Sequence, residues 1–307
     1  MKPTSHSIPA ASAVLLLGFF AATAQADILY VANRSNKTID KFTSGPFPTV
    51  FASEPANSSL AGIAFDIAGN LYVADTNRNT IDMFTPGGAK SVFATTGFGG
   101  PYGLAFDRLG NLYASYNDGR IIERFTPGGI GTVFANSGLV SPKGIAFDSV
   151  GNLYVTNVGS VEKFSPVGTD LGAFVTGGSL NGPVGLAFDP GGNLYVSNSN
   201  GNSVLKFDSG GNQVGTVGTG SSPGLMAFDS AGNLNVSGSS IQTYTQALSP
   251  VPNNFNSTGS TSSLAFTNDA GVPLPLANQV PEPASLALLG LGACLLAARR
   301  RRPMAAE

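Results

Sequence analysis

Six copies of one short phrase, Gly-Asn-Leu-Tyr-Val or a variant of it, run along this chain. Four close copies begin at Gly69, Gly110, Gly151 and Gly192. A weaker copy begins at Gly232, and residues 28–31 are a copy without the leading Gly-Asn. The leucines of successive copies stand 42, 41, 41, 41 and 40 residues apart. A fixed period near 40 residues predicts a stack or a ring of similar units.

Each unit divides into four short β-rich segments separated by Gly, Pro and Asn. In the third unit these segments are residues 103–107, 112–116, 120–125 and 131–135. Runs of this kind predict strands joined by hairpins. The first two segments are apolar on both faces, which indicates a sheet that is covered on both sides. Four antiparallel strands in each of six units predict an all-β, six-bladed β-propeller over residues 27–268.

The two ends of the repeat region complement each other. The first unit begins at Ile28 and lacks the apolar Ala-Phe-Asp segment that opens the other units. A spare copy of that segment, residues 263–267, follows the sixth unit with no second segment behind it. We expect this late strand to complete the first blade and close the ring, because an incomplete blade would leave an open sheet edge.

The N-terminus has the composition of an export signal. Lys2 precedes a mostly apolar run at residues 10–22, and Ala24 and Ala26 form a small-x-small cleavage site. These features predict a signal peptide over residues 1–26. The alternative is a retained membrane anchor, but the run is shorter than the roughly 20 apolar residues that a spanning helix needs.

The C-terminus carries three ordered elements after an extended linker at residues 269–279. Pro281, Glu282 and Pro283 precede an apolar run at residues 284–298. Four arginines follow the run: Arg299, Arg300, Arg301 and Arg302. As a helix the run would span about 22 Å, which is short for a bilayer but is accommodated by snorkelling arginines and local thinning. Residues 280–302 are therefore predicted to hold the protein transiently in the inner membrane, with the arginines on the cytoplasmic side.

This tail resembles the PEP-CTERM sorting signal of bacterial surface proteins, which has the same three elements in the same order. The resemblance implies an exosortase-type membrane peptidase as a partner. That peptidase would process the tail and release the protein to the cell surface or the extracellular matrix. The alternative is a plain C-terminal anchor, which would not need Pro-Glu-Pro at its entrance.

The repeat units resemble NHL repeats, a propeller family with the pattern Gly-Ile-Ala-Val-Asp, then Gly-Asn-Ile-Tyr-Val-Ala-Asp, then an Arg-Ile-x-x-Phe strand. Residues 63–66, 69–75 and 81–84 match this pattern, and the resemblance extends over nearly all of residues 28–267. It implies the fold and leaves the activity open, because such propellers include enzymes, binding proteins and scaffolds.

An Asp recurs before x-x-Gly-Asn in five units. These residues are Asp66, Asp107, Asp148, Asp189 and Asp229. Each loop has a single carboxylate, whereas Ca²⁺ takes six to eight oxygens that include several carboxylates. We therefore expect each Asp to accept backbone N–H groups of its hairpin, while the Gly and the Asn take strained turn angles. The Tyr of each phrase and the Phe of each third strand are expected to pack between blades.

Variable loops on one face of the ring are the predicted binding surface, because function usually lies on variable loops that a rigid frame holds. Strand ends and loops there would line a central channel with amides, a carboxylate, two phenols and a Lys, suited to a polar small molecule or glycan. The candidates are Asp75, Tyr102, Tyr116, Lys143, Asn157 and Asn198. The alternative is that the Asn and Asp side chains form Asx turns.

The composition of the chain excludes some classes of function. The only His, His6, lies in the predicted signal, and the only Cys, Cys294, lies in the tail, so the predicted mature domain has no His base. Residues 27–279 hold 16 Asp and Glu against 11 Lys and Arg, a charge of −5 without a basic cluster, which argues against nucleic acid. We expect no catalytic residue, metal or cofactor, and a non-enzymatic binding or scaffold protein for an extracellular protein or polysaccharide. The alternative is a metal-assisted lyase or lactonase that uses Asp75 in the channel.

Overall fold

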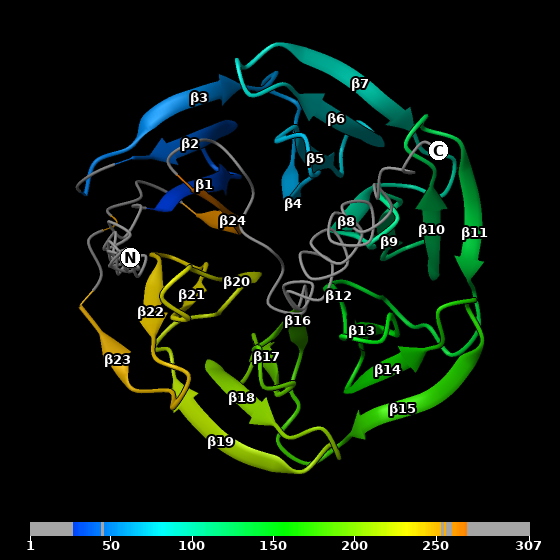
Figure 1. Cartoon of the computed structure of the whole chain (residues 1–307), viewed down its shortest axis with the longest axis vertical. Coiled ribbons are helices and arrows are strands. Elements are labelled where there is room, and N and C mark those ends of the chain that lie inside the picture. The colour runs from blue at the N-terminus through cyan, green and yellow to red at the C-terminus, as the bar shows by residue number, and fades with distance from the viewer. Residues whose placement is uncertain (1–26, 44–45, 253–254, 256–259, 269–307) are drawn as a thin grey trace, which may run out of the picture.

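The computed structural model describes residues 27–43, 46–252, 255 and 260–268. Within them, 24 strands form six four-stranded antiparallel sheets, which stand as blades around a ring (Figure 1). The predicted six-bladed propeller is confirmed. The predicted signal peptide, linker and sorting tail lie outside the described residues. Among the residues described, no helix has the length and hydropathy to cross a membrane, and the run at 284–298 is not among them.

Each blade runs from an innermost strand to an outermost one (Figure 1). The innermost strands are β24 (Thr261–Asn268), β4 (Leu60–Phe65), β8 (Pro101–Phe106), β12 (Ile145–Phe147), β16 (Pro183–Phe188) and β20 (Met226–Phe228). The second strands are β1 (Asp27–Asn33), β5 (Leu71–Asp75), β9 (Leu112–Tyr116), β13 (Leu153–Asn157), β17 (Leu194–Asn198) and β21 (Leu234–Val236).

The outer half of each blade completes the sheet. The third strands are β2 (Thr38–Phe42), β6 (Thr80–Phe84), β10 (Ile121–Phe125), β14 (Ser160–Phe164), β18 (Ser203–Phe207) and β22 (Gln242–Tyr244). The outermost strands are β3 (Thr49–Ser53), β7 (Lys90–Thr95), β11 (Gly131–Ala135), β15 (Asp170–Thr176), β19 (Gln213–Gly218) and β23 (Pro250–Val251). We number the blades 1 to 6 in the order of their second strands.

Blade 1 is closed by the last described strand, as the sequence predicts. Its order is β24-β1-β2-β3, and β24 pairs antiparallel with β1, so that Leu29 lies opposite Phe266. The Ser263 hydroxyl also accepts a hydrogen bond from the backbone N–H of Ile63 in blade 2, at 3.2 Å. The late strand therefore joins the two ends of the described chain and contacts the next blade.

The core lies between blades, where four of the five repeated Tyr residues each pack between two Phe rings. The Tyr72 ring lies 4.9 Å from Phe93 of its own blade and 5.0 Å from Phe106 of the next blade, edge to face in both cases. The same pairs form at Tyr30, Tyr113 and Tyr154. Such contacts add about 0.5–1.5 kcal/mol each beyond area burial. The repeated Tyr and third-strand Phe residues are buried, which confirms the prediction that they belong to the core.

The repeated Asp organises the turn between the first and second strands. Asp66 Oδ1 accepts the backbone N–H groups of Ala68 and Asn70, each at 2.9 Å. Asp66 Oδ2 accepts the Asn70 side-chain amide at 2.8 Å and the Tyr72 hydroxyl at 3.3 Å. Gly69 has a φ of 82°, as expected, but the expectation of a strained angle at the Asn is wrong, because the Asn contributes its side-chain donor instead. Burial first, and then the Asp66 charge and hydrogen bond, raise the pKa of Tyr72 to about 12.

These turns define the two ends of the ring. We call the end that carries the Asp-x-x-Gly-Asn turns the turn face. Its turns are residues 66–70, 107–111, 148–152, 189–193 and 229–233. The opposite end, where second strands finish and the loops to the next blade begin, is the loop face.

Candidate functional site

Four of the six predicted binding residues end a second strand and are at most 6% exposed. They are Asp75, Tyr116, Asn157 and Asn198. Asn157 accepts the backbone N–H of Val140 and donates to the carbonyl of Gly138 at 2.8 Å, so it fastens the preceding loop. Asn198 makes the equivalent pair of hydrogen bonds in blade 5. The two amides hold the backbone of a loop 17 to 19 residues earlier in the chain, so these bonds are structural but differ from the local Asx turns that the sequence left open as the alternative.

In blades 1, 3 and 4 the strand-end residue is hydrogen-bonded to an acidic residue on the third strand of the same blade. In blade 3 the Tyr116 hydroxyl donates to Glu123 Oε2 at 2.8 Å. The same pairing joins Asn33 to Asp40 in blade 1 and Asn157 to Glu162 in blade 4, each at 3.3 Å. Burial raises the pKa of Glu123, and the hydrogen bond from Tyr116 offsets part of that effect. In these three blades a neutral donor therefore satisfies a buried carboxylate.

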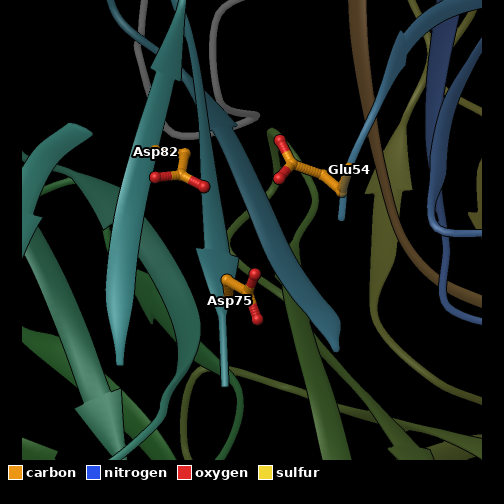
Figure 2. A group of neighbouring side chains, drawn as sticks. All are labelled: Glu54, Asp75 and Asp82. Carbon is orange, nitrogen blue, oxygen red and sulfur yellow. The ribbon is translucent and has the colours of Figure 1, made fainter. Parts of the chain in front are cut away.

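Blade 2 departs from this pattern because its strand-end residue, Asp75, is an acceptor. Asp75 gathers with Asp82 of β6 and with Glu54, which follows β3 of blade 1 (Figure 2). One carboxylate oxygen from each of the three lies within 4.8 Å of the others. All three side chains are buried. We call this group, at the seam between blades 1 and 2, the acidic cluster.

Two cations reach the acidic cluster. Lys90 Nζ lies 2.9 Å from Asp82 Oδ2 and 2.5 Å from Glu54 Oε2. Arg78 Nη1 lies 3.6 Å from the same two oxygens. Burial raises the pKa of Glu54, and Lys90 offsets part of that effect. Burial also acts against the charge on Lys90, but hydrogen bonds with Glu54 and Asp82 leave its pKa above the ordinary value.

Oxygen ligands of this kind suit Ca²⁺ or Mg²⁺. Asp75 Oδ2 and Glu54 Oε1 have no hydrogen-bond partner among the described residues. The ammonium of Lys90, however, already lies against two of the three carboxylates, so a metal held by all three would compete with it. The sequence did not reveal this cluster, because Glu54 comes from another blade and Asp82 lies in a strand that the repeat pattern assigned to the frame.

The remaining two predicted residues, Tyr102 and Lys143, come together on the loop face. Lys143 Nζ lies 6.0 Å from the centroid of the Tyr102 ring, and the Arg34 guanidinium lies at the same distance. Arg34 follows β1 of blade 1, whereas Tyr102 and Lys143 belong to the entries of blades 3 and 4. Because these blades are not all neighbours, the three residues meet near the axis of the ring. We call them the cation–tyrosine group.

The cation–tyrosine group is half-buried and accessible. Neither Arg34 nor Lys143 has a carboxylate within 4.0 Å in the part of the chain that the structure describes. The Arg34 Nε–H donates to the Leu60 carbonyl at 3.1 Å, which orients the guanidinium. Sequence reasoning missed Arg34 because it considered only the last residue of the second strand, Asn33. The available signal was a basic residue one position further on.

A cavity of about 790 Å³ lies within the ring and is lined by all six innermost strands. Its walls repeat the Ala-Phe step of these strands, including Phe65, Phe147 and Phe228, and it reaches the turn face at Ile67 and Leu109. None of the six predicted binding residues is part of its lining. The observed cavity is thus apolar and extends to the turn face, whereas the sequence predicted a polar channel on the loop face.

Close contact between innermost strands explains this difference. A Cβ on Gly62 would lie 2.4 Å from the carbonyl oxygen of Tyr102, and one on Gly103 would lie 2.3 Å from that of Lys143. The Ser115 hydroxyl bridges the strands here, since it accepts the Gly103 N–H at 2.9 Å and donates to the Lys143 carbonyl. The strands therefore meet near the loop face, and the open space is left beside the Ala and Phe residues.

Family models match three short parts of the chain. Residues 279–302 match the PEP-CTERM protein-sorting motif, residues 180–207 match the NHL repeat and residues 129–156 match a beta-propeller repeat. Both resemblances stated from the sequence are confirmed. A PEP-CTERM motif indicates an exported, surface-directed protein that an exosortase recognises. A comparison with curated proteins gives no significant match.

Solved structures confirm the fold at low sequence identity. A chain of a nidogen–laminin complex superposes with a TM-score of 0.71 and 21% identity, covering 78% of this chain and 98% of that one. Virginiamycin B lyase from Staphylococcus aureus gives 0.61 and 15%, over 82% and 90%. A gluconolactonase from Xanthomonas campestris gives 0.55 and 20%, over 70% and 84%. At these sequence identities the similarity shows only that the fold is the same. Both enzymes and a protein from a binding complex have this fold.

Proposed function

From an exported six-bladed propeller with an NHL repeat and a PEP-CTERM sorting motif, we propose a non-enzymatic binding protein of the cell surface or extracellular matrix. Its ligand is a polysaccharide that carries acidic groups, held on the loop face. The cation–tyrosine group, Arg34, Tyr102 and Lys143, is the observation that supports this ligand most directly.

The chemistry of the group suits an acidic sugar. Guanidinium and ammonium groups pair with carboxylate or sulfate oxygens through charge-assisted hydrogen bonds. The Tyr102 ring adds an amphipathic surface with a polar tip. The domain is acidic overall, with 16 acidic residues against 11 basic ones in residues 27–279, so two cations beside one Tyr ring are a local concentration of positive charge.

A glycan array of acidic and neutral polysaccharides tests the proposal on the purified mature protein. We expect binding to carboxylated or sulfated chains, weakened at least tenfold by Arg34→Gln combined with Lys143→Gln. Lys163→Gln is the matched control, because Lys163 also lies over a Tyr ring, that of Tyr154 at 5.1 Å, but outside the group. Equal binding of neutral chains, or full binding by the double variant, would contradict the proposal. Binding only to an extracellular protein would favour the other partner class.

The location has its own test. If Pro281, Glu282 and Pro283 are replaced by Ala in the native host, we expect the protein to stay in the membrane fraction, because the triplet marks the sorting motif at residues 279–302. Release at the wild-type level would argue for a plain anchor or for no sorting through this tail.

A metal-assisted lyase or lactonase is the second candidate, and the acidic cluster is the observation that favours it. Metal analysis of the purified mature protein separates the two candidates. One equivalent of divalent metal that survives dialysis and is lost in Asp82→Asn would favour the enzyme. Absence of bound metal after incubation with Ca²⁺, Mg²⁺ or Zn²⁺ would leave the binding protein.

A further inference from the structure

We propose that the apolar run of this chain's own sorting tail, residues 284–298, docks in the apolar cavity at the turn face before a membrane takes it up. The inference rests on the sorting motif at residues 279–302 and is independent of the polysaccharide proposal. It names an intramolecular partner for a cavity that none of the predicted binding residues lines.

Exposed apolar residues stand at the mouth of the cavity, beside the polar side chains of Asp66, Asn70 and Asp107. Ile67, Leu109 and Val150 occupy one turn each in three successive blades and are 89%, 82% and 73% exposed. Ile67 and Leu109 also line the cavity. Exposed apolar residues that continue into an apolar hollow mark a surface that another apolar group covers.

The tail leaves the ring beside this mouth. β24 runs towards the turn face, since Phe266 lines the cavity in the same position as Phe65 and Phe106 of the neighbouring innermost strands. The strand ends at Asn268, two residues beyond Phe266. Residues 269–283 then connect the strand to the apolar run, and 15 residues reach up to about 50 Å when extended. The run is therefore tethered within easy reach of the cavity.

The run has the size and chemistry that the cavity accepts. Ala, Leu and Gly make up 13 of its 15 residues, and none of the 15 is charged. A helix about 10 Å wide would fill a volume near 790 Å³ with about seven residues, at 1.5 Å rise per residue. Roughly half of the run would thus enter the hollow, and the rest would lie against Ile67, Leu109 and Val150.

Charge also matches at the mouth. Each of the five turns around it carries an Asp, and four arginines follow the run directly. The carboxylate of Asp189 already forms an ion pair with Lys206 at 3.6 Å, so not all five carboxylates are free to pair with the arginines. Docking in this way would keep six leucines out of water after synthesis and would release them to a bilayer, which is a larger apolar sink.

Cys294, the only cysteine, lies within the run and reports on docking without any engineered label. In the chain from residue 27 to 307, purified without detergent, we expect alkylation of Cys294 to be slow. Filling the cavity with Ala146→Phe and Ala227→Phe, two lining positions, should accelerate it at least tenfold. Val158→Phe, at a 67% exposed position next to a strand end of the loop face, is the control and should leave the rate unchanged. Equal rates in all three proteins, each with a native melting transition, would overturn the proposal.

A crosslink keeps the test decisive if the filled variant does not fold. Ile67→Cys should join to Cys294 through a short bis-maleimide within one chain, and Val158→Cys should not. No crosslink from Ile67→Cys above the level of Val158→Cys would overturn the docking. Crosslinked dimers in place of an internal link would show that a second copy occupies the cavity, which also contradicts the proposal.

Discussion

Blades 2 and 3 have different side chains at the same place in the fold. This place, where the end of the second strand meets the third strand, we call the corner of the blade. Both place a second-strand end beside an acidic residue of the third strand. In blade 3 the pair is Tyr116 and Glu123, joined by a hydrogen bond of 2.8 Å. In blade 2 it is Asp75 and Asp82, and Asp82 Oδ2 forms ion pairs with Lys90 at 2.9 Å and Arg78 at 3.6 Å instead. One blade satisfies its buried carboxylate with a neutral hydroxyl and the other with charges.

A third position changes together with the first two. Lys90 begins β7 opposite Phe84, and the equivalent residue opposite Phe125 in blade 3 is Gly131. A Cβ on Gly131 would lie 2.3 Å from Glu123 Oε1, so the longer acid fills the space in which blade 2 places its Lys side chain. A buried carboxylate on the third strand therefore has a hydrogen-bond donor in blade 3 and cations in blade 2, so the acidic cluster is one of two ways to offset the cost of burying that charge.

Both corners form within a closed ring. Of the changes considered, removal of the closing strand should therefore lower the stability of the protein most. Deleting residues 263–268 removes most of β24, which pairs with β1 and contacts blade 2. We expect loss of the cooperative unfolding transition in a denaturant titration, because blade 1 would keep an open edge. A chain that ends at residue 268 is the control and should unfold like the mature protein. A deletion variant with an unchanged midpoint would refute closure by β24.

Lys90→Ala should break the blade 2 corner. It leaves Glu54 and Asp82 buried with only the more distant Arg78, and removal of one partner of a buried ion pair costs up to 3–5 kcal/mol. Because the Lys90 side chain is 30% exposed, we expect a smaller loss, about 2 kcal/mol, measured by urea denaturation. Lys163→Ala, at a third-strand lysine stacked over Tyr154, should change stability by less than about 0.5 kcal/mol. Equal effects would mean that the charges do not hold this corner.

Tyr116→Phe is the corresponding test of the corner in blade 3. It removes the donor to Glu123 and leaves a buried carboxylate oxygen unsatisfied, which costs about 1–3 kcal/mol. Adding Glu123→Gln to the variant should recover part of the loss, since a neutral amide costs less to bury. If the double variant is no more stable than Tyr116→Phe alone, carboxylate satisfaction is not what the hydroxyl contributes.

Asp75→Asn should convert the blade 2 corner towards that of blade 1, where Asn33 donates to Asp40. We expect unfolding free energy to stay equal or rise by up to about 1 kcal/mol. The cost of Lys90→Ala should be smaller in this background, which a double-mutant cycle measures. Independent, additive effects would show that Asp75 and Lys90 do not belong to one network.

The smallest expected effect is the pH dependence of the stability that Glu123 causes. Burial raises the pKa of Glu123 above its ordinary 4.5, so folding favours its protonated form. Its contribution to stability is then fully present below pH 4.5 and is lost as the pH rises through the folded-state pKa. Relative to Glu123→Gln, the wild-type protein should therefore gain stability between pH 7 and pH 4, as denaturation at both values would show. A constant difference between the two proteins would contradict the raised pKa.

Local sequence was sufficient for the frame. The spacing of the Leu-Tyr phrase predicted six blades, the spare segment at 263–267 predicted the closing strand, and Asp66 with its counterparts was correctly assigned to turns. These predictions succeeded because each depends on one unit, or on two units that have the same pattern. The surroundings of the strand-end residues could not be predicted in this way. Asp75 and Asn157 end their second strands, but their burial depends on loops from elsewhere in the chain, to which their side chains are hydrogen-bonded.

The number of blades, the strand order, the chemistry of the turns and the sorting tail could all be predicted from the sequence, because each depends on a pattern inside one unit or on the regular return of that pattern. Which side chains face the axis of the ring became visible only in the folded structure. Neighbouring blades approach one another closely at Gly62, Gly103, Gly144 and Gly185, which leaves the hollow beside Ala and Phe, and no single unit contains these contacts. The same holds for the meeting of Glu54 with Asp75 and of Arg34 with Tyr102, since each joins residues from different blades that closure of the ring brings together.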